Sequence, residues 1–277
     1  MATPYRRHTY REIPYLLNSR PGPLHHSPLA FAHRGADPRR ENTMGAFRRA
    51  VDLGYRYLEI DVRTSADGTL VVFHDEELDR ATTGTGRLSE KTWRELSELR
   101  VGAEGEFTEE LVRFEELLTT WEDVHFNVDL KDAESVPEFT RIVEEHQAHD
   151  RVLAASFNDA RRHRVRRLLS RPVATSGGWA ATALIVLLGP LGLMRRLTGR
   201  IAEIDCVQVP ISQGRIRVVT PRFVQRCHRA GLQVHVWVVD DPAQMHELLD
   251  MGVDGLMTDD AEALAGVMRE RSVWPQR

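Results

Sequence analysis

Lysine and cysteine are both scarce in this chain of 277 residues. Lysine occurs only as Lys91 and Lys131, beside 35 arginines, so each lysine marks a position to examine. Cysteine occurs only as Cys206, in an apolar strand-like run, and as Cys227, in a helical run. Two cysteines so placed do not form a disulfide framework, and we expect two buried thiols in a reducing compartment.

Long apolar runs and an excess of charge of one sign are missing too. The most apolar stretch, 183–194, is too short to span a bilayer and is interrupted by Gly189 and Pro190. It predicts a buried helix and loop, with a surface patch for lipid or protein contact as the alternative. The N-terminal segment holds no apolar stretch of signal-peptide length, which favours a cytoplasmic protein. A net charge of −4 gives no reason to expect nucleic acid as a partner.

The length and the balance of residues suit one large domain. Hydrophobic residues make up 42% of the chain and charged residues 28%, as in ordinary globular proteins. Residues 1–27 are punctuated by prolines and lack helical periodicity, so they predict an irregular arm. Residues 28–277 then form a single domain, within the usual size of about 250 residues for an α/β barrel.

From Leu29 onward, short β-like runs alternate with amphipathic helical segments. The predicted strands are 29–35, 57–62, 124–131, 152–157, 173–176, 206–210, 234–239 and 255–259. Helix starts are marked at Thr43, Thr220 and Asp241, the last two being followed by proline. Such alternation predicts parallel strands with right-handed crossovers, and eight repeats favour a closed (β/α)₈ TIM barrel over an open sheet.

An insertion interrupts the barrel after the second strand. The turn at Asp67 and Gly68 and the run 69–75 predict an extra hairpin. A polar excursion follows, so that the insertion occupies about 75–115 and includes a helix near 92–99.

Polar side chains stand where the predicted strands end, which is the face of such a barrel that carries the chemistry. Strand alternation points Glu59 and Asp61 to the same side, and likewise Asp129 and Lys131. The complete set of polar or aromatic residues at these ends is His33, Arg34, Glu59, Asp61, His74, Asp75, Asp129, Lys131 and Trp237.

So many ionisable groups are too polar to be ordinary core packing, because buried charges persist only when they are paired or bind metal. The carboxylates suit Mg²⁺ or Ca²⁺ better than zinc. Arginine and lysine beside them suit a phosphate, and the two histidines suit proton transfer near neutral pH. The residue types therefore predict metal-assisted cleavage of a phosphate ester.

Each of these residues also has a purely structural interpretation. Glu59 and Asp61 could pair with arginines, and Asp129 could simply pair with Lys131. Trp237 could be a packing residue. The arginine-rich run 161–167 indicates a solvated helix face, with weak contact to an anionic membrane as the alternative.

The motifs His-Arg-Gly (33–35), Glu-Asn-Thr (41–43), Glu-x-Asp (59–61) and Phe-His-Asp (73–75) occur in this order. With these motifs, the chain from about Phe31 to Leu264 resembles the glycerophosphodiester phosphodiesterase family. The resemblance implies metal-dependent hydrolysis of glycerophosphodiesters to glycerol 3-phosphate and an alcohol.

The resemblance also implies a role for each matching residue. His33 and His74 would be the general acid and base, and Glu59, Asp61 and Asp129 would bind Mg²⁺ or Ca²⁺. Arg34 and Lys131 would hold the phosphate, Trp237 would wall the alcohol site, and Glu41 would orient Arg34 or the metal site.

The motifs depart from the family's usual pattern at three positions. Arg40 stands where proline usually precedes Glu-Asn-Thr, Asp129 where glutamate is more frequent, and Val238 where threonine usually follows the tryptophan. The shorter side chain of Asp129 implies a metal that lies deeper or is reached through water.

Two other functions stay open at this point. The same site could act as a lysophospholipase D on lipids with one acyl chain, for which the stretch 183–194 would help to form an apolar groove. It could also be a module that binds a phosphodiester without cleaving it, although the presence of acid, base and ligand types argues against this.

Overall fold

The computed structural model describes residues 13–19, 27–102, 105, 108–188 and 204–275, and within them the fold is the predicted eight-stranded parallel α/β barrel. Around the barrel the strands are β1 (Leu29–His33), β2 (Tyr57–Thr64), β7 (His125–Leu130), β8 (Val152–Ala155), β9 (Ala174–Thr175), β10 (Cys206–Val209), β13 (Gln233–Val236) and β14 (Gly255–Thr258). Each of the eight coincides with a predicted strand, and the largest overrun is two residues, at the end of β2.

The barrel closes between β9 and β10. The two strands are joined by a parallel bridge between Ser176 and Cys206. The amide of Gly177 donates to the carbonyl of Cys206 over 2.9 Å, and the amide of Asp205 donates to Thr175 over the same distance. By contrast, β2 and β7 stay in register from Tyr57 opposite His125 to Val62 opposite Leu130.

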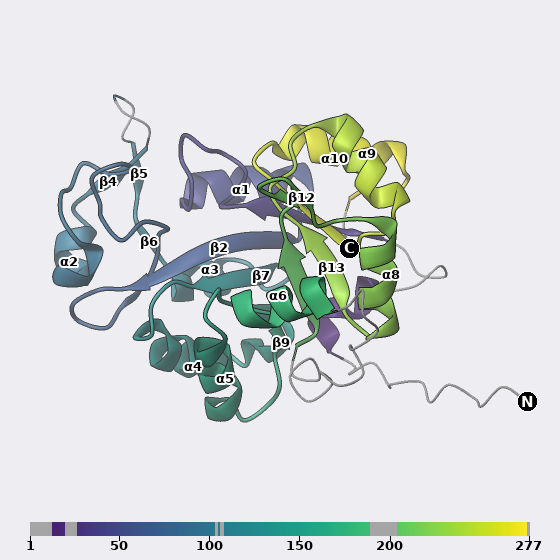
Figure 1. The fold of residues 1–277 in the computed structure, drawn as a ribbon. Helices are drawn as coiled ribbons and strands as arrows, with labels where there is room; N and C mark the ends of the chain where they lie inside the picture. The colour runs from purple at the N-terminus through teal and green to yellow at the C-terminus, as the bar shows by residue number, and fades with distance from the viewer. Residues whose placement is uncertain (1–12, 20–26, 103–104, 106–107, 189–203, 276–277) are drawn as a thin grey trace, which may run out of the picture.

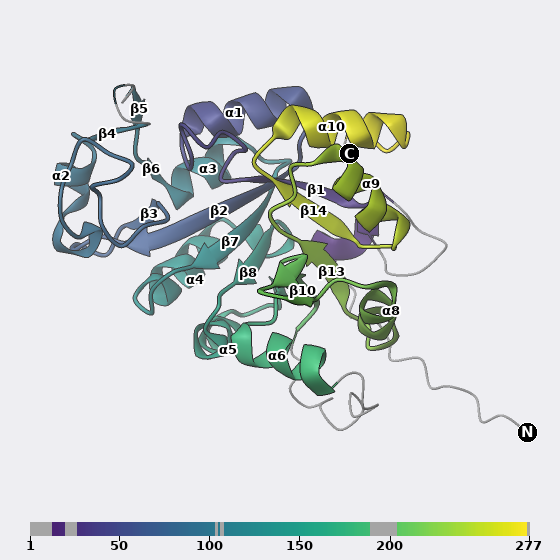
Figure 2. The same cartoon turned by 45° about the horizontal axis from the view of Figure 1, so that its top comes forward.

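Helices cover the outside of the barrel (Figure 1), and Figure 2 shows them around the strands. They are α1 (Met44–Leu53), α3 (Phe114–Thr120), α4 (Ser135–Glu145), α5 (Asp159–Leu168), α6 (Trp179–Leu188), α8 (Pro221–Arg229), α9 (Pro242–Asp250) and α10 (Ala261–Glu270). Short 3-10 helices are η2 (Leu88–Glu90) and η3 (Ala148–Asp150).

The predicted helix starts are confirmed by their N-cap hydrogen bonds. The side chains of Thr43, Thr220 and Asp241 accept from the amides of Ala46, Phe223 and Ala243. Pro221 and Pro242 then occupy the first helical position, where the missing N–H costs nothing. Each of these caps typically contributes about 1 kcal/mol to helix stability.

Two hydrophobic cores follow from the two-residue period of the strands. On β2, Leu58, Ile60 and Val62 face outward into the larger core, which lies between the barrel and the helices. Tyr57 faces inward and joins a smaller core inside the barrel, together with residues such as Phe31 and Cys206. Because Glu59 and Asp61 share the parity of Tyr57, they also face the barrel interior.

The two cysteines are buried free thiols, as predicted. Burial raises the pKa of Cys206 well above its ordinary value and that of Cys227 to about 12. Both thiols are therefore protonated at neutral pH and unreactive.

The segment 1–27, for which no regular structure is expected, contributes a buried element to the barrel. Residues 14–19 form the 3-10 helix η1 (Pro14–Ser19), and Ile13, Tyr15 and Leu16 belong to the core inside the barrel. The hydroxyl of Tyr57 donates to the carbonyl of Tyr15 over 3.1 Å, and Nε2 of Gln233 donates to that of Leu16 over 3.3 Å. This segment thus packs against the inward-facing side chains of the barrel.

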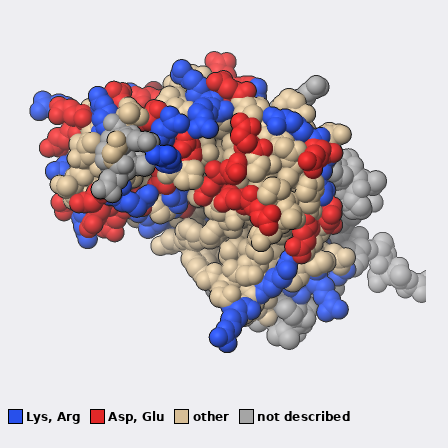
Figure 3. Space-filling model, turned by 90° about the horizontal axis from the view of Figure 1, so that it is seen from above, with Lys and Arg blue, Asp and Glu red and all other residues tan. Residues whose placement is uncertain are grey.

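The predicted hairpin is confirmed, since β3 (Leu70–Val72) runs antiparallel to β2 with Val72 opposite Val62. The insertion further contains α2 (Trp93–Leu96), β4 (Arg100–Val101), β5 (Glu109–Glu110) and β6 (Val112–Arg113). It has its own small core, which includes Leu78, Leu88 and Leu96. Charged side chains of both signs cover it, whereas a broad uncharged area lies over the barrel beside it (Figure 3).

The apolar stretch is buried on only one side of the helix it forms. In α6, Ala181 and Ile185 are buried, but Trp179 is 58% and Leu187 68% exposed. Residues 189–194 of the predicted helix and loop lie outside the described residues. Among the helices that the structure describes, none is long and apolar enough to cross a membrane. A second exposed hairpin, β11 (Ser212–Gln213) with β12 (Ile216–Arg217), follows β10.

The packing of Tyr15 predicts a stability difference between two substitutions. Its ring is fully buried and lies edge-on to Tyr57 and His125, with ring centroids 5.4 and 5.5 Å apart. Its hydroxyl is buried without a partner in the described structure. Tyr15→Ala should therefore lower the free energy of unfolding by about 3 kcal/mol or more, whereas Tyr15→Phe should leave it unchanged or raise it.

Urea denaturation of the two variants beside Ile216→Ala, an exposed control, measures this difference. Equal stability of Tyr15→Ala and the wild type would mean that residues 13–19 are not part of the cooperative fold.

Candidate active site

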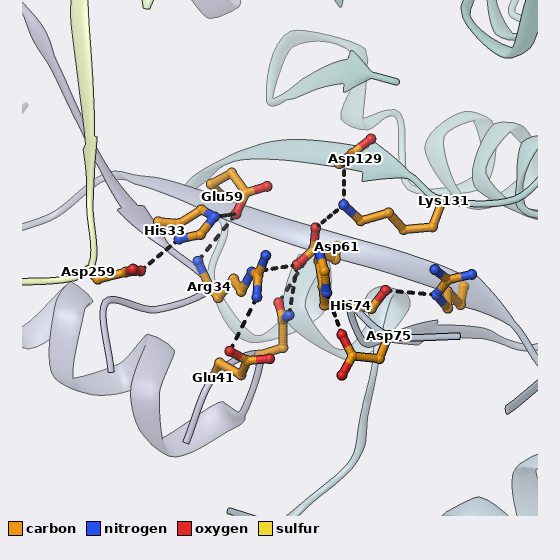
Figure 4. Close-up of polar contacts among 12 residues, drawn as sticks. His33, Arg34, Glu41, Glu59, Asp61, His74, Asp75, Asp129, Lys131 and Asp259 are labelled. Carbon is orange, nitrogen blue, oxygen red and sulfur yellow. Dashed lines mark hydrogen bonds and ion pairs between the residues drawn. The ribbon is translucent and has the colours of Figure 1, made fainter. Parts of the chain in front are cut away.

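The polar residues predicted at the strand ends gather in one pocket at the carboxyl ends of the barrel strands (Figure 4). Strands β1, β2 and β7 carry His33, Glu59, Asp61 and Asp129, and the adjoining loops carry the others. The predicted residues that line this pocket are His33, Arg34, Glu59, Asp61, His74, Asp129, Lys131 and Trp237.

The register of β2 and β7 brings the carboxylates together. Asp61 stands opposite Asp129, and Glu59 stands opposite Asn127. All four are buried, and their shared parity directs them into the barrel. Negative charge is thus concentrated where little water can reach it.

Two cations neutralise this charge at Asp61. Nε of Arg34 lies 2.9 Å from one oxygen of Asp61, and Nζ of Lys131 lies 2.8 Å from the other. Lys131 also lies 2.6 Å from Asp129. Burial alone would raise the pKa of Asp61, but Lys131 and Arg34 outweigh it and hold the pKa below its ordinary value. Burial and the charge of Asp61 raise the pKa of Glu59 instead.

The loop after β1 has a backbone that only a specific sequence allows. Gly35 has a φ of 89°, and a Cβ there would lie 2.7 Å from Cβ of Ala46. Asn42 has a φ of 60° and donates through Nδ2 to Asp61 over 3.0 Å. The His-Arg-Gly and Glu-Asn-Thr motifs therefore fold over the carboxylates and fix Arg34 beside them.

His33 is oriented by a carboxylate that directly follows β14, the last barrel strand. Its Nδ1 lies 2.7 Å from Oδ1 of Asp259, and its Nε2 lies 3.7 Å from Glu59. Burial alone would lower the pKa of His33, but Glu59 and Asp259 outweigh it and raise the pKa. Asp259 was not predicted as a site residue, although its place at the end of a predicted strand was a usable signal.

His74 has the same arrangement on the other side of the pocket. Its Nδ1 lies 2.6 Å from Oδ1 of Asp75, and the other oxygen of Asp75 accepts from Arg80 over 2.5 Å. Arg80 also pairs with Glu41. Glu41 in turn lies 3.2 Å from Nη1 of Arg34, so it lies in a position to orient Arg34. Arg80, to which the sequence analysis gave no role, thus connects the loops of both histidines.

The opposite wall of the pocket is mostly uncharged. Phe157, just after β8, and Trp237, just after β13, lie edge-on with ring centroids 6.2 Å apart. Nζ of Lys131 lies 5.8 Å from the centroid of the Phe157 ring. Phe157 was not predicted from the sequence, nor were the remaining residues of this wall, which are Ala155, Ser156, Ser176, Gly177, Gln208 and Met257.

The carboxylates fit a hard divalent cation by their chemistry. Oδ1 of Asp129 is buried without a partner in the described structure, so it is available as a ligand. Within the described residues, no three His, Cys, Asp or Glu side chains form a ready metal cluster. Lys131 and Arg34 supply the positive charge among these carboxylates in the described arrangement. A cation could be held by Glu59, Asp61 and Asp129 once Lys131 withdraws from them.

Comparison with known proteins gives consistent results over nearly the whole barrel. The model of the glycerophosphoryl diester phosphodiesterase family matches residues 33–263. A Mycobacterium tuberculosis protein named probable glycerophosphodiester phosphodiesterase 2 is 40% identical, covering 90% of this chain and 94% of that protein. A glycerophosphodiester phosphodiesterase of Caldanaerobacter subterraneus is 29% identical, covering 87% and 98%.

Solved structures have the same fold. A structure from Silicibacter pomeroyi superposes with a TM-score of 0.77 at 23% identity, covering 94% of this chain and 98% of that chain. An Oleispira antarctica phosphodiesterase, solved with sn-glycerol-3-phosphate as product, superposes with a TM-score of 0.72 at 22% identity, covering 87% and 97%. From the match of the family model and the 40% identical relative, we conclude that this chain belongs to the glycerophosphoryl diester phosphodiesterase family and is a phosphoric diester hydrolase.

Proposed function

We propose that the protein hydrolyses glycerophosphodiesters to glycerol 3-phosphate and an alcohol, with His33 and His74 as the acid–base pair. The observation that carries this proposal is that both histidines line the pocket and that a carboxylate contacts Nδ1 of each. A carboxylate that accepts from Nδ1–H leaves Nε2 to exchange a proton with a substrate. Their placement on both sides of Arg34 suits one histidine to the attacking oxygen and the other to the departing one.

The remaining residues supply positive charge to the phosphodiester. Arg34 offers a planar guanidinium and Lys131 a mobile ammonium, and both suit phosphate oxygens. Mg²⁺ or Ca²⁺ held by Glu59, Asp61 and Asp129 would act as a Lewis acid that neutralises charge building on the phosphoryl oxygens. Lys131 would then withdraw from Asp61 and Asp129, with which it pairs in this structure, and turn its ammonium to a phosphate oxygen.

The two histidines carry out the proton transfers of the reaction. One histidine accepts the proton of the attacking hydroxyl, and the other donates a proton to the oxygen of the departing alcohol. The attacking hydroxyl belongs either to water or to the 2-position of the substrate's glycerol, which would first give a cyclic phosphate. In both cases the net reaction consumes one water. By the cyclic route the two histidines exchange roles in the second step and so regain their starting protonation states, whereas after direct attack of water they regain them by exchanging protons with the solvent.

The acid–base proposal predicts a large loss of turnover without unfolding. His33→Ala and His74→Ala should each reduce the rate of glycerol 3-phosphate release from glycerophosphocholine by at least about 10²-fold, the usual contribution of general acid–base catalysis. His246→Ala is the matched control, since His246 lies outside the pocket and pairs with Glu270. Near-normal turnover in both pocket variants would contradict the assignment.

The metal proposal predicts binding that depends on Asp129. A chelator should abolish glycerol 3-phosphate release, and added Mg²⁺ or Ca²⁺ should restore it. In calorimetric titrations with these cations, Asp129→Asn should weaken binding by about tenfold or more, because a ligand has lost its charge. Asp123→Asn, which changes an exposed carboxylate, should bind as the wild type does. Unchanged binding by Asp129→Asn would remove Asp129 from the ligand set.

Exposed apolar side chains beside the pocket favour lysophospholipids as a second substrate class. Phe157 is 50% exposed, and its ring centroid lies 6.5 Å from that of Trp179, which begins α6. Leu187 extends the exposed apolar surface along the same helix. A single acyl chain attached to the glycerol could pack along this surface, which would give lysophospholipase D activity.

This second activity predicts a selective effect at Trp179. Trp179→Ser should lower kcat/KM for micellar lysophosphatidylcholine severalfold, because the acyl chain loses an aromatic contact, and should leave that for glycerophosphocholine unchanged. Choline release measures both reactions with the same readout. Absence of activity of the wild type on lysophosphatidylcholine would exclude this substrate class.

A further inference from the structure

The wall opposite the carboxylates contains an amide that the reaction described above does not use. The strands follow the order β1, β2, β7, β8, β9, β10, β13 and β14 around the barrel, so β10 lies diametrically across from β2. Gln208 on β10 therefore lies across the pocket from Glu59 and Asp61, and all three line it. A substrate anchored at the carboxylates would extend toward Gln208.

The direction of the Gln208 side chain follows from the pattern of β10. Val207 and Val209 belong to the core outside the barrel, and Cys206 belongs to the core inside it. Gln208 shares the parity of Cys206 and points inward. Its Nε2 is buried and has no hydrogen-bond partner in the described part of the chain. A buried amide N–H that lacks a partner is costly, and native proteins seldom keep one without a reason.

A second inward-facing glutamine shows how such an amide is otherwise satisfied. On the neighbouring strand β13, Nε2 of Gln233 donates to the carbonyl of Leu16 over 3.3 Å. Its Oε1 lies 3.0 Å from Nε2 of His235. Gln233 is thus held by the protein itself, and the missing partner of Gln208 is a property of its place beside the pocket.

The surroundings of Gln208 restrict the kind of group it would bind. Besides Gln208, this wall is formed by aromatic and small or apolar side chains and by two serines, Ser156 and Ser176, and the hydroxyl of Ser156 already donates to the carbonyl of Leu130 over 3.0 Å. None of the described residues that line this wall is charged, so the wall offers no partner for an ammonium or for a second anion. A neutral hydroxyl fits, because an amide can both donate to it and accept from it.

We infer that Gln208 binds a hydroxyl of the substrate's glycerol moiety and so selects glycerophosphodiesters over diesters that lack it. This inference rests on the proposed glycerophosphodiester substrate. Gln208 determines specificity and is not a catalytic group, since it lies across the barrel from the carboxylates of β2. The phosphate stays with Arg34 and Lys131, while the glycerol arm reaches across the barrel to Gln208.

The test compares two phosphate ligands that differ only in hydroxyl groups, glycerol 3-phosphate and propyl phosphate. Calorimetric titration of the full-length protein with Mg²⁺ or Ca²⁺ present gives the affinity of each. The wild type should bind glycerol 3-phosphate about tenfold more tightly than propyl phosphate, as expected for one hydrogen bond in an enclosed site. Gln208→Met keeps the side-chain size and should abolish the preference, with propyl phosphate affinity unchanged.

Matched variants make the outcomes distinct. Gln225→Met changes an exposed glutamine of α8 and should keep the wild-type preference. Binding of propyl phosphate shows that the Gln208→Met variant is folded. If that variant does not fold, Gln208→Asn, which shortens the side chain and keeps the amide, takes its place in the test. The inference would be overturned if Gln208→Met kept the wild-type preference for glycerol 3-phosphate, or if it lost affinity equally for both ligands. If the wild type bound glycerol 3-phosphate no more tightly than propyl phosphate, the proposed glycerophosphodiester substrate would be overturned as well. Hydrolysis of another phosphodiester by the same protein would then still support the proposed hydrolase chemistry.

Discussion

The ionised carboxylate of Asp61, almost fully buried in the C-terminal half of β2, sets the conditions for the rest of the site. A buried charge is tolerated only when opposite charges or strong hydrogen bonds surround it. Arg34 and Asn42, both from the loop after β1, and Lys131, which follows β7, meet this requirement. The first loop must therefore fold back over β2, and the end of β7 must lie beside it. The placement of β2 between β1 and β7 in the sheet satisfies both conditions at once.

Lys131 illustrates why the type of cation matters here. Its ammonium lies between Asp61 and Asp129, where a planar guanidinium would be less easily accommodated. A lysine side chain has a compact charge on a flexible stem, so it can leave the carboxylates without disturbing the backbone. In a chain with two lysines beside 35 arginines, the lysine at this position coincides with a place where a small, movable charge is needed.

Much of the fold and of the site could be read from local sequence. The strands were predictable because runs such as 57–62 are short and aliphatic, and helix starts such as Thr220–Pro221 carry their own signals. Glu59, Asp61 and Asp129 could be grouped because strand parity and parallel register are regular. Asp259 was missed because its partner, His33, lies 226 residues away, and only the pairing of β1 with β14 brings the two together. Arg80 was missed because it lies in the irregular insertion after β3, and Gln208 because a single polar residue in an apolar strand carries no local signal of a site. The 3-10 helix η1 was missed because six residues show no periodicity, and its burial depends wholly on tertiary packing.

The seam between β9 and β10 gives the two halves of the pocket different mechanical properties. β2 and β7 are joined by six residue pairs in register, whereas β9 has only two residues and meets β10 through one bridge. Hydrogen exchange at this seam should be faster than in β2 and β7, since fewer hydrogen bonds must open together. The half with the acidic ligands is thus stiff, and the half with Gln208, Phe157 and α6 is more compliant. Such a division lets mutation reshape which alcohols and acyl groups are accommodated while the geometry around the phosphate stays fixed.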